Sequence, residues 1–94
     1  MISYKAMYKF EPDGVHAEVL DFPGAISCGR DLEEARRQLA GALVDMAETT
    51  LLQHQPLPLP NPAATAAEAD LEEPIHLLLS AAAQVKIVPE AVTT

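Results

Sequence analysis

A cysteine and a histidine in the first third of the chain have the chemistry for nucleophilic catalysis. Cys28 and His16 fall on segments that we expect to be neighbouring strands, where an imidazole could take the proton of a thiol and leave a thiolate nucleophile. Such a centre also needs a group that orients the histidine and donors for an oxyanion. A lone cysteine in a short strand is more often a small apolar core residue. We therefore expect Cys28 in the core, and we assign no catalytic residue.

Carboxylates near the same segments could hold divalent metal ions. They are Glu11, Asp13, Glu18 and Asp21. A two-metal nuclease needs several carboxylates that converge on ions about 4 Å apart. All of these except Glu18 fall on expected turns, which favours a solvated acidic rim. The histidines have no zinc-ligand spacing, and a second cysteine is lacking; they are His16, His54 and His76. The sequence predicts neither a metal nor a cofactor.

Composition narrows the classes of partner. The chain has 94 residues and a net charge of −8, and an acidic surface repels phosphate backbones. Its few early cations are too sparse for a nucleic-acid stripe; they are Lys5, Lys9, Arg36 and Arg37. A basic protein is the natural complement. One cysteine excludes an internal disulfide, and neither a long apolar run nor a signal peptide is evident. These features predict a cytoplasmic protein without a membrane span.

The elements that carry these residues follow from periodicity. Apolar and polar residues alternate over 2–10 and again over 15–20, which predicts two strands. The "EPDG" turn between them, with Gly14, makes an antiparallel hairpin. Pro23 and Gly24 turn the chain again, and the "AISCG" segment is a short third strand that Gly29 closes.

One long amphipathic helix should follow this third strand. Asp31 can cap its first turn, and Glu34, three residues later, can complete a capping box. Apolar spacing then predicts a helix from Leu32 to Leu52 that covers one face of the sheet. Its buried stripe is expected to comprise Leu32, Ala35, Leu39, Ala42, Leu43, Met46 and Thr50.

The remaining chain divides into a linker and a tail. Residues 53–74 are rich in proline and acids, and we expect an extended linker there. A fourth strand over 75–79 should be followed by a short helix at about 81–88, although the alternation also permits one long strand. The whole is an α+β fold in β-β-β-α-β order, a small antiparallel sheet of about four strands with the helix on one face. We treat 1–52, 53–74 and 75–94 as parts of one domain.

Several motifs in this order resemble the HicB family of antitoxins from bacterial type II toxin–antitoxin modules. They are the Asp13-Gly14 turn, the "DFPG" turn from Asp21 to Gly24, the helix start from Gly29 to Ala35, and the "PLPLP" exit at 56–60. The resemblance covers about residues 1–80 and implies a partial ribonuclease H-like fold. Family members often continue into a DNA-binding helical domain, and we expect no such domain in this chain.

The resemblance implies a non-enzymatic inhibitor. Its partner would be a HicA-type toxin, a small basic ribonuclease that cleaves mRNA with a histidine. Independently of the resemblance, a small sheet with free edges and a thin core predicts self-association as a dimer or tetramer. We expect the partner-binding residues in the second turn and at the helix start; they are Asp21, Phe22, Asp31, Glu33 and Glu34. The structural turn residues are Gly14, Pro23, Gly24 and Gly29. Two alternatives remain open: an orphan oligomeric binding module without a toxin, and a small metal-dependent nuclease.

Overall fold

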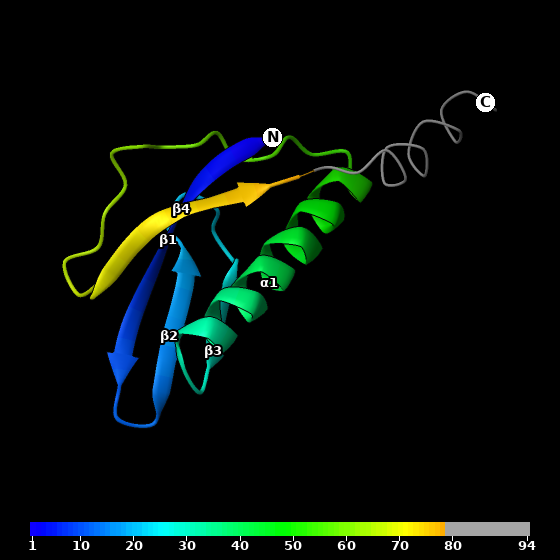
Figure 1. Cartoon of the computed structure of the whole chain (residues 1–94). Coiled ribbons are helices and arrows are strands. Elements are labelled where there is room, and N and C mark those ends of the chain that lie inside the picture. Colours follow the sequence, from blue (N-terminus) through cyan, green and yellow to red (C-terminus); the bar gives the residue numbers. More distant parts are fainter. Residues whose placement is uncertain (79–94) are drawn as a thin grey trace, which may run out of the picture.

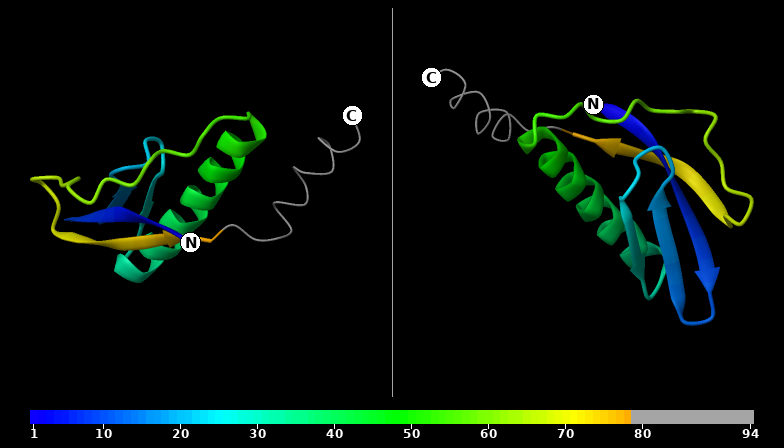
Figure 2. Two further views of the ribbon diagram at one scale, coloured as in Figure 1. Left: turned by 90° about the horizontal axis from the view of Figure 1, so that it is seen from above. Right: turned by 180° about the vertical axis from the view of Figure 1, so that it is seen from behind.

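The computed structural model describes residues 1–78, and the expected helix at 81–88 lies outside them. One helix and a four-stranded antiparallel sheet confirm the α+β class and the β-β-β-α-β order (Figure 1). The elements are β1 (Ile2–Glu11), β2 (Gly14–Val19), β3 (Ile26–Gly29), α1 (Leu32–Leu52) and β4 (Leu71–Leu77). In the sheet the strands lie in the order β3-β2-β1-β4, so β3 and β4 form its two edges (Figure 2).

The strand registers divide the side chains between two faces of the sheet. Ala6 lies opposite Val19 on β2 and Glu73 on β4, and alternate residues share its side. This side, which we call the helix face, packs against α1. The intervening residues point to the opposite side, which we call the far face; Met7, for example, lies between Glu18 and Glu72 there.

The core lies between the helix face and α1. Tyr4, Tyr8 and Phe22 are its largest aromatic members, and the rings of Tyr4 and Phe22 meet edge to face with centroids 5.3 Å apart. Two residues of β1 depart from the predicted alternation of buried and exposed positions. Phe10 shares the helix face but is 51% exposed, because it lies near the hairpin tip, whereas Met7 is buried on the far face.

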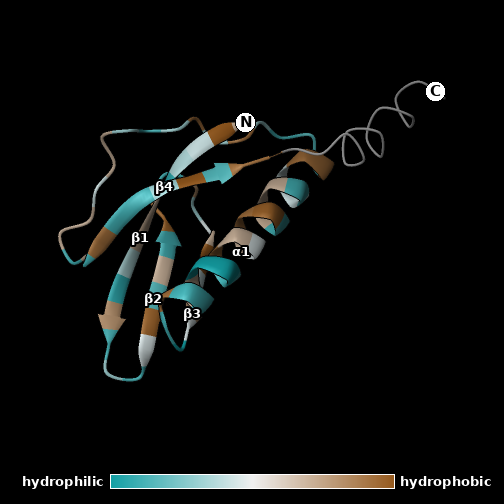
Figure 3. Cartoon of the chain, in the orientation of Figure 1, coloured by the Kyte–Doolittle hydropathy of each residue, from teal (hydrophilic) through white to brown (hydrophobic). Residues whose placement is uncertain are grey.

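Helix α1 has the predicted bounds, Leu32–Leu52, and Asp31 is its N-cap. Polar and apolar residues alternate along it in Figure 3. Its fully buried residues are Ala35, Leu39, Leu43 and Ala47. Ala47 thus replaces the expected Ala42, which is only half-buried. Arg36 projects from the helix over the ring of Tyr8, 5.9 Å from its centroid, and forms two hydrogen bonds to the carboxylate of Glu73.

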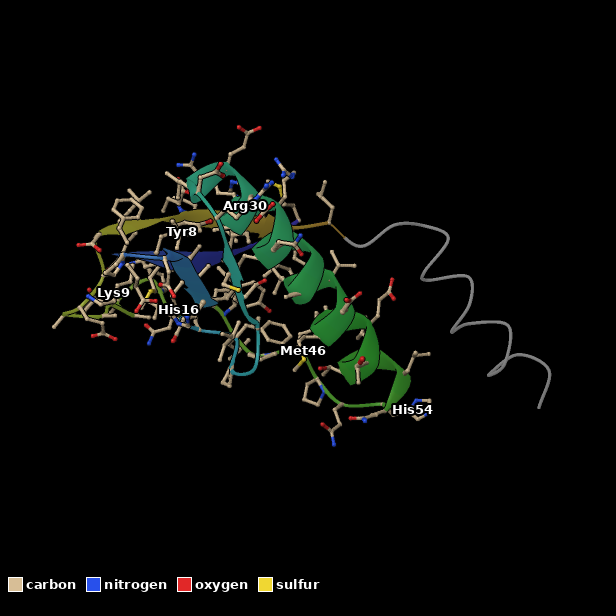
Figure 4. The ribbon with its side chains drawn as sticks, turned by 90° about the horizontal axis from the view of Figure 1, so that it is seen from below. Tyr8, Lys9, His16, Arg30, Met46 and His54 are labelled. Carbon is tan, nitrogen blue, oxygen red and sulfur yellow. The ribbon has the colours of Figure 1, made fainter. Side chains whose placement is uncertain are left out.

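Residues 53–70, which we call the strap, connect α1 to β4 without regular structure and are bonded to the sheet along their course. The Tyr4 hydroxyl donates to the carbonyl of Pro58 at 2.7 Å, and the Lys5 ammonium donates to that of Pro62 at 2.8 Å. Lys9 reaches the carbonyl of Glu68 at 3.4 Å, and Figure 4 shows it beside the strap. The strap is thus held first by Tyr4 of the helix face and then by Lys5 and Lys9 of the far face, and it packs as part of the fold.

The fourth strand begins earlier than expected, at Leu71 instead of Ile75, and ends at Leu77. The last four residues of the expected linker therefore belong to β4. Glu72 and Glu73 are accommodated there because they point to opposite faces and each finds a partner: Glu72 accepts from the Thr65 hydroxyl at 2.7 Å, and Glu73 pairs with Arg36. Pro74 is tolerated because β4 is an edge strand. Within residues 1–78, no helix is long and apolar enough to cross a membrane.

Candidate protein-binding surface

The expected partner-binding residues lie at opposite ends of the sheet. The turn that contains Asp21 and Phe22 follows the end of β2, whereas Asp31 follows the end of β3, which runs antiparallel to β2. In Figure 1 the helix start lies at the lower end, beside the turn between β1 and β2. The two groups therefore do not form one surface.

Asp21 and Phe22 have structural roles in their turn. One carboxylate oxygen of Asp21 accepts from the backbone N–H of Lys5, and the other accepts from that of Asn61, each at 2.8 Å. The side chain of Phe22 is 2% exposed and packs on Tyr4. Phe22 is thus a core residue, and the expectation that its side chain meets a partner is withdrawn.

The turn itself explains the "DFPG" motif. The N–H of Phe22 donates to the carbonyl of Val19 and the N–H of Ala25 to that of Phe22, both at 3.2 Å, which reverses the chain between β2 and β3. Gly24 has a φ of 94°, which residues with a Cβ rarely adopt. Pro23 is exposed at the tip, where its ring fixes φ and no N–H is required.

The acids of the helix start are largely occupied by the capping of α1. The carboxylate of Asp31 accepts from the N–H of Glu34 at 2.8 Å. Glu34 in turn accepts from the backbone N–H of Arg30 at 2.9 Å and pairs with its guanidinium, and these bonds lower the pKa of the Glu34 carboxyl. Glu33 points outward and reaches Arg37 at 3.4 Å. Among these three acids, Glu33 is the most available to a partner.

Close packing brings the hairpin turn against the helix start. A Cβ on Gly14 would lie 2.7 Å from the carbonyl oxygen of Gly29, and a Cβ on Gly29 would lie 2.9 Å from the Cα of Ala35. Real Cβ atoms do not approach so closely, so glycine is required for this contact. Because the hairpin turn and the helix start approach so closely, Asp13 at the hairpin tip lies at the same end of the sheet as the N-terminus of α1.

Further carboxylates complete this end, and we call the set the acidic end. Its members are Glu11, Asp13, Asp31, Glu33, Glu34 and Asp70. Asp70 is placed here because it accepts from the backbone N–H of Phe10 at 2.7 Å. In the part of the chain that the structure describes, no ion pair joins Glu11, Asp13 or Asp70 to a cation. The acidic end therefore presents uncompensated negative charge beside the exposed ring of Phe10.

A shallow hollow lies at this end, on the far face. Glu11 and Asp13 flank it, and His16 and Cys28 belong to its wall; its volume is about 220 Å³. The hollow is open to solvent and lies beside two carboxylates, which suits a cationic side chain of a protein partner.

The structure brings together some of the residues considered for catalysis and separates those considered for metal binding. His16 lies directly opposite Cys28 on the far face. The Oε1 atom of Glu18 lies 3.2 Å from Nε2 of His16. Cys28 is exposed, so the expectation that it packs in the core is wrong. Asp21 lies at the other end of the sheet from Glu11 and Asp13. Among residues 1–78, no three histidine, cysteine or acidic side chains are grouped so as to hold a metal ion.

Sequence reasoning did not place Glu11, Asp13 and Asp70 in the candidate protein-binding surface. Asp70 comes to the hairpin only through the pairing of β4 with β1, 60 residues away in the chain. Phe10 alternates in step with the core residues of β1, so its position in the sequence did not predict that its ring is exposed. No protein-family model matches the chain, and no curated protein matches it.

Proposed function

We propose that this protein is a HicB-like antitoxin that binds and inhibits a small basic ribonuclease of the HicA type in the cytoplasm. The motifs that resemble the HicB family suggest this class, and the α+β architecture with one helix on a small antiparallel sheet is the one that the resemblance implies. The protein itself performs no chemistry in this proposal. It inhibits the ribonuclease by binding to it and covering its RNA-binding surface.

The acidic end is the observation that carries the proposal. A ribonuclease presents a basic surface to the phosphates of its RNA substrate, and uncompensated carboxylates are complementary to such a surface. Glu11, Asp13 and Glu33 project at the acidic end, and the partly exposed ring of Phe10 lies among them. An aromatic anchor with a charged surround is a common composition for a protein interface.

Inhibition would be steric and electrostatic. Opposite charges speed the encounter, because long-range attraction raises association rates well above those of neutral surfaces. Once docked, the acidic end would cover the RNA-binding surface of the toxin, and mRNA would be excluded. No group on this chain needs an altered protonation state for that mechanism.

The test is co-expression of the full chain with the product of the neighbouring gene, followed by co-purification and an mRNA-cleavage assay. We expect a basic partner that co-purifies with the chain and cleaves RNA only when the chain is absent. Two matched charge reversals test whether the acidic end is the surface that binds the partner. Replacing Asp13 with Lys should weaken binding of the partner, whereas replacing Asp45 with Lys, on the exposed side of α1, should not.

Two results would contradict the proposal. If the neighbouring product neither binds the chain nor cleaves RNA, the chain is better described as an orphan binding module. If the purified chain itself cleaves RNA with added Mg²⁺ and loses this activity on replacement of Glu18 by Gln, it is a nuclease.

A further inference from the structure

Steric constraints fix the backbone of the proline-rich part of the strap. From Gln55 to Pro62 the sequence is QPLPLPNP, so every residue is a proline or directly precedes one. Each proline ring holds its own φ near about −65°, and its Cδ drives the preceding residue into the extended region. The structure accordingly has no helix, strand or turn over 55–61 and no positive φ there. The segment is therefore a polyproline II helix, which repeats about every three residues.

The sheet holds one side of this segment in place. Leu57 packs against the hydrophobic core. The carbonyl of Pro58 accepts from the Tyr4 hydroxyl at 2.7 Å, and the N–H of Asn61 donates to the carboxylate of Asp21 at 2.8 Å. The extended conformation thus exists before any partner binds, and docking onto it costs little ordering entropy.

The opposite side of the segment faces solvent. At a spacing of three residues, Pro56, Leu59 and Pro62 share one edge of a polyproline II helix, and all three are exposed. We call them the ridge. Leu59 is 87% exposed, although it is a large apolar residue. The strap runs along the end of the sheet away from the β1–β2 hairpin, so the ridge is remote from the acidic end (Figure 1).

The chemistry of this surface selects one mode of recognition. No acidic or basic side chain lies between Glu48 and Glu68, so charge does not recruit a partner there. The prolines have no N–H, which disfavours pairing with a β-strand. In the described part of the chain, no donor reaches the carbonyl oxygens of Leu57, Leu59 or Pro60. Aromatic side chains that carry an N–H or O–H suit such a surface, because their rings pack on proline and leucine while their polar atoms donate to carbonyls.

We propose that the ridge docks into a groove lined with Trp and Tyr side chains on a protein partner. Rings of the partner pack against Leu59 and the flanking prolines, and their N–H and O–H groups donate to the free carbonyls. A hollow of about 330 Å³, lined by Pro62 and Pro74 among others, adjoins the ridge and has room for one such ring. This partner is distinct from a basic ribonuclease at the acidic end, and the proposal does not rest on the antitoxin function.

Titration of the full chain into a purified WW domain tests the proposal. Such a domain binds polyproline II segments in an aromatic-lined groove. The chain contains no tryptophan, so tryptophan fluorescence reports on the domain alone. We expect a saturable change in this fluorescence. Its absence up to a chain concentration of about 1 mM, the range of very weak binding, would overturn the proposal.

Substitutions of exposed residues locate the contact. Leu59→Lys should raise the Kd for the WW domain about tenfold or more, as expected for loss of a central apolar anchor, with an unchanged far-ultraviolet circular dichroism spectrum. Val44→Lys makes the same charge change at an exposed position on α1 and should leave the Kd unaltered. Asp13→Lys, which tests the acidic end, should bind the WW domain normally. Equal affinities for the wild type and Leu59→Lys would show that the ridge is not the site.

Discussion

The carboxylate of Asp21 joins β1 to Asn61 of the strap: one oxygen accepts from the backbone N–H of Lys5 and the other from that of Asn61, each at 2.8 Å. The strap thereby closes over an end of the sheet where β2 has already turned away. A side chain here continues the hydrogen bonding that a strand would otherwise supply.

Replacing Asp21 with Asn should loosen the strap. The amide NH₂ cannot accept a hydrogen bond, so one backbone N–H loses its partner, and we expect the free energy of unfolding to fall by about 1–3 kcal/mol. Urea unfolding measures this loss, and hydrogen exchange should show faster exchange at Asn61. Asp13→Asn, at an exposed turn position, is the matched control. Equal stabilities for the two variants would contradict the structural role of Asp21.

Gly29 should be intolerant of alanine. An added Cβ would lie 2.9 Å from the Cα of Ala35, and neighbouring backbone would have to move. We expect a loss of about 1–3 kcal/mol, as for other overpacked sites. Gly41 is the control, because nothing lies within 4 Å of its Cβ position. Gly41→Ala should stabilise α1 by up to about 1 kcal/mol. Thermal unfolding should therefore shift in opposite directions for the two variants.

The sequence predicted those elements whose periodicity is local. Alternation in β1 and β2, and the cap at Asp31, are visible within short windows, and α1 has the predicted bounds. The start of β4 was not predictable in this way. Leu71 to Pro74 resemble a linker because Glu72 and Glu73 are consecutive charges, and their partners, Thr65 and Arg36, come from other segments.

The candidate surface was predictable only in part. Asp31 and Glu34 were assigned to the partner, but the structure shows them engaged in the helix cap, a role that the same spacing also predicts. The register that brings Asp70 to Phe10 depends on pairing between distant strands, which local patterns do not encode. Burial of Phe22 likewise depends on contact with Tyr4 across the core.

Glu73 should stabilise the folded protein at neutral pH, and acid should abolish this stabilisation. The hydrogen bonds from Arg36 lower the pKa of the Glu73 carboxyl. Its contribution is therefore present above the ordinary glutamate pKa of about 4.3 and is lost as pH falls through the lowered value. Glu73→Gln should cost about 0.5–1 kcal/mol at pH 7 and progressively less below pH about 4. Urea titrations across this range test the sign, and Glu48→Gln, exposed on α1, should have no comparable effect.

Tyr8 should make the protein sensitive to alkali. Burial, followed by the charge of Glu73, raises the pKa of Tyr8 to about 12. A raised pKa means that its contribution is complete below the ordinary tyrosine value of about 10 and is lost as pH rises through 12. Titration at 295 nm should show a late phenolate transition that Tyr8→Phe abolishes. If the earlier transition disappears instead, the late one belongs to Tyr4, and the assignment is wrong.

Charge reversal at the acidic end should weaken toxin binding through the association rate. Glu11 and Asp13 form no ion pair with a described cation and flank the same hollow, so Glu11→Lys and Asp13→Lys replace attraction with repulsion toward a basic surface. We expect each to raise the Kd for the co-purified partner about tenfold or more at low salt, and the effect should shrink near 0.5 M NaCl as screening increases. Surface plasmon resonance separates the two rate constants. Glu48→Lys makes the same charge change on α1, away from the hollow, and should alter the Kd little. An equal loss for all three variants would show that only net charge matters, and would remove the acidic end as the site of contact.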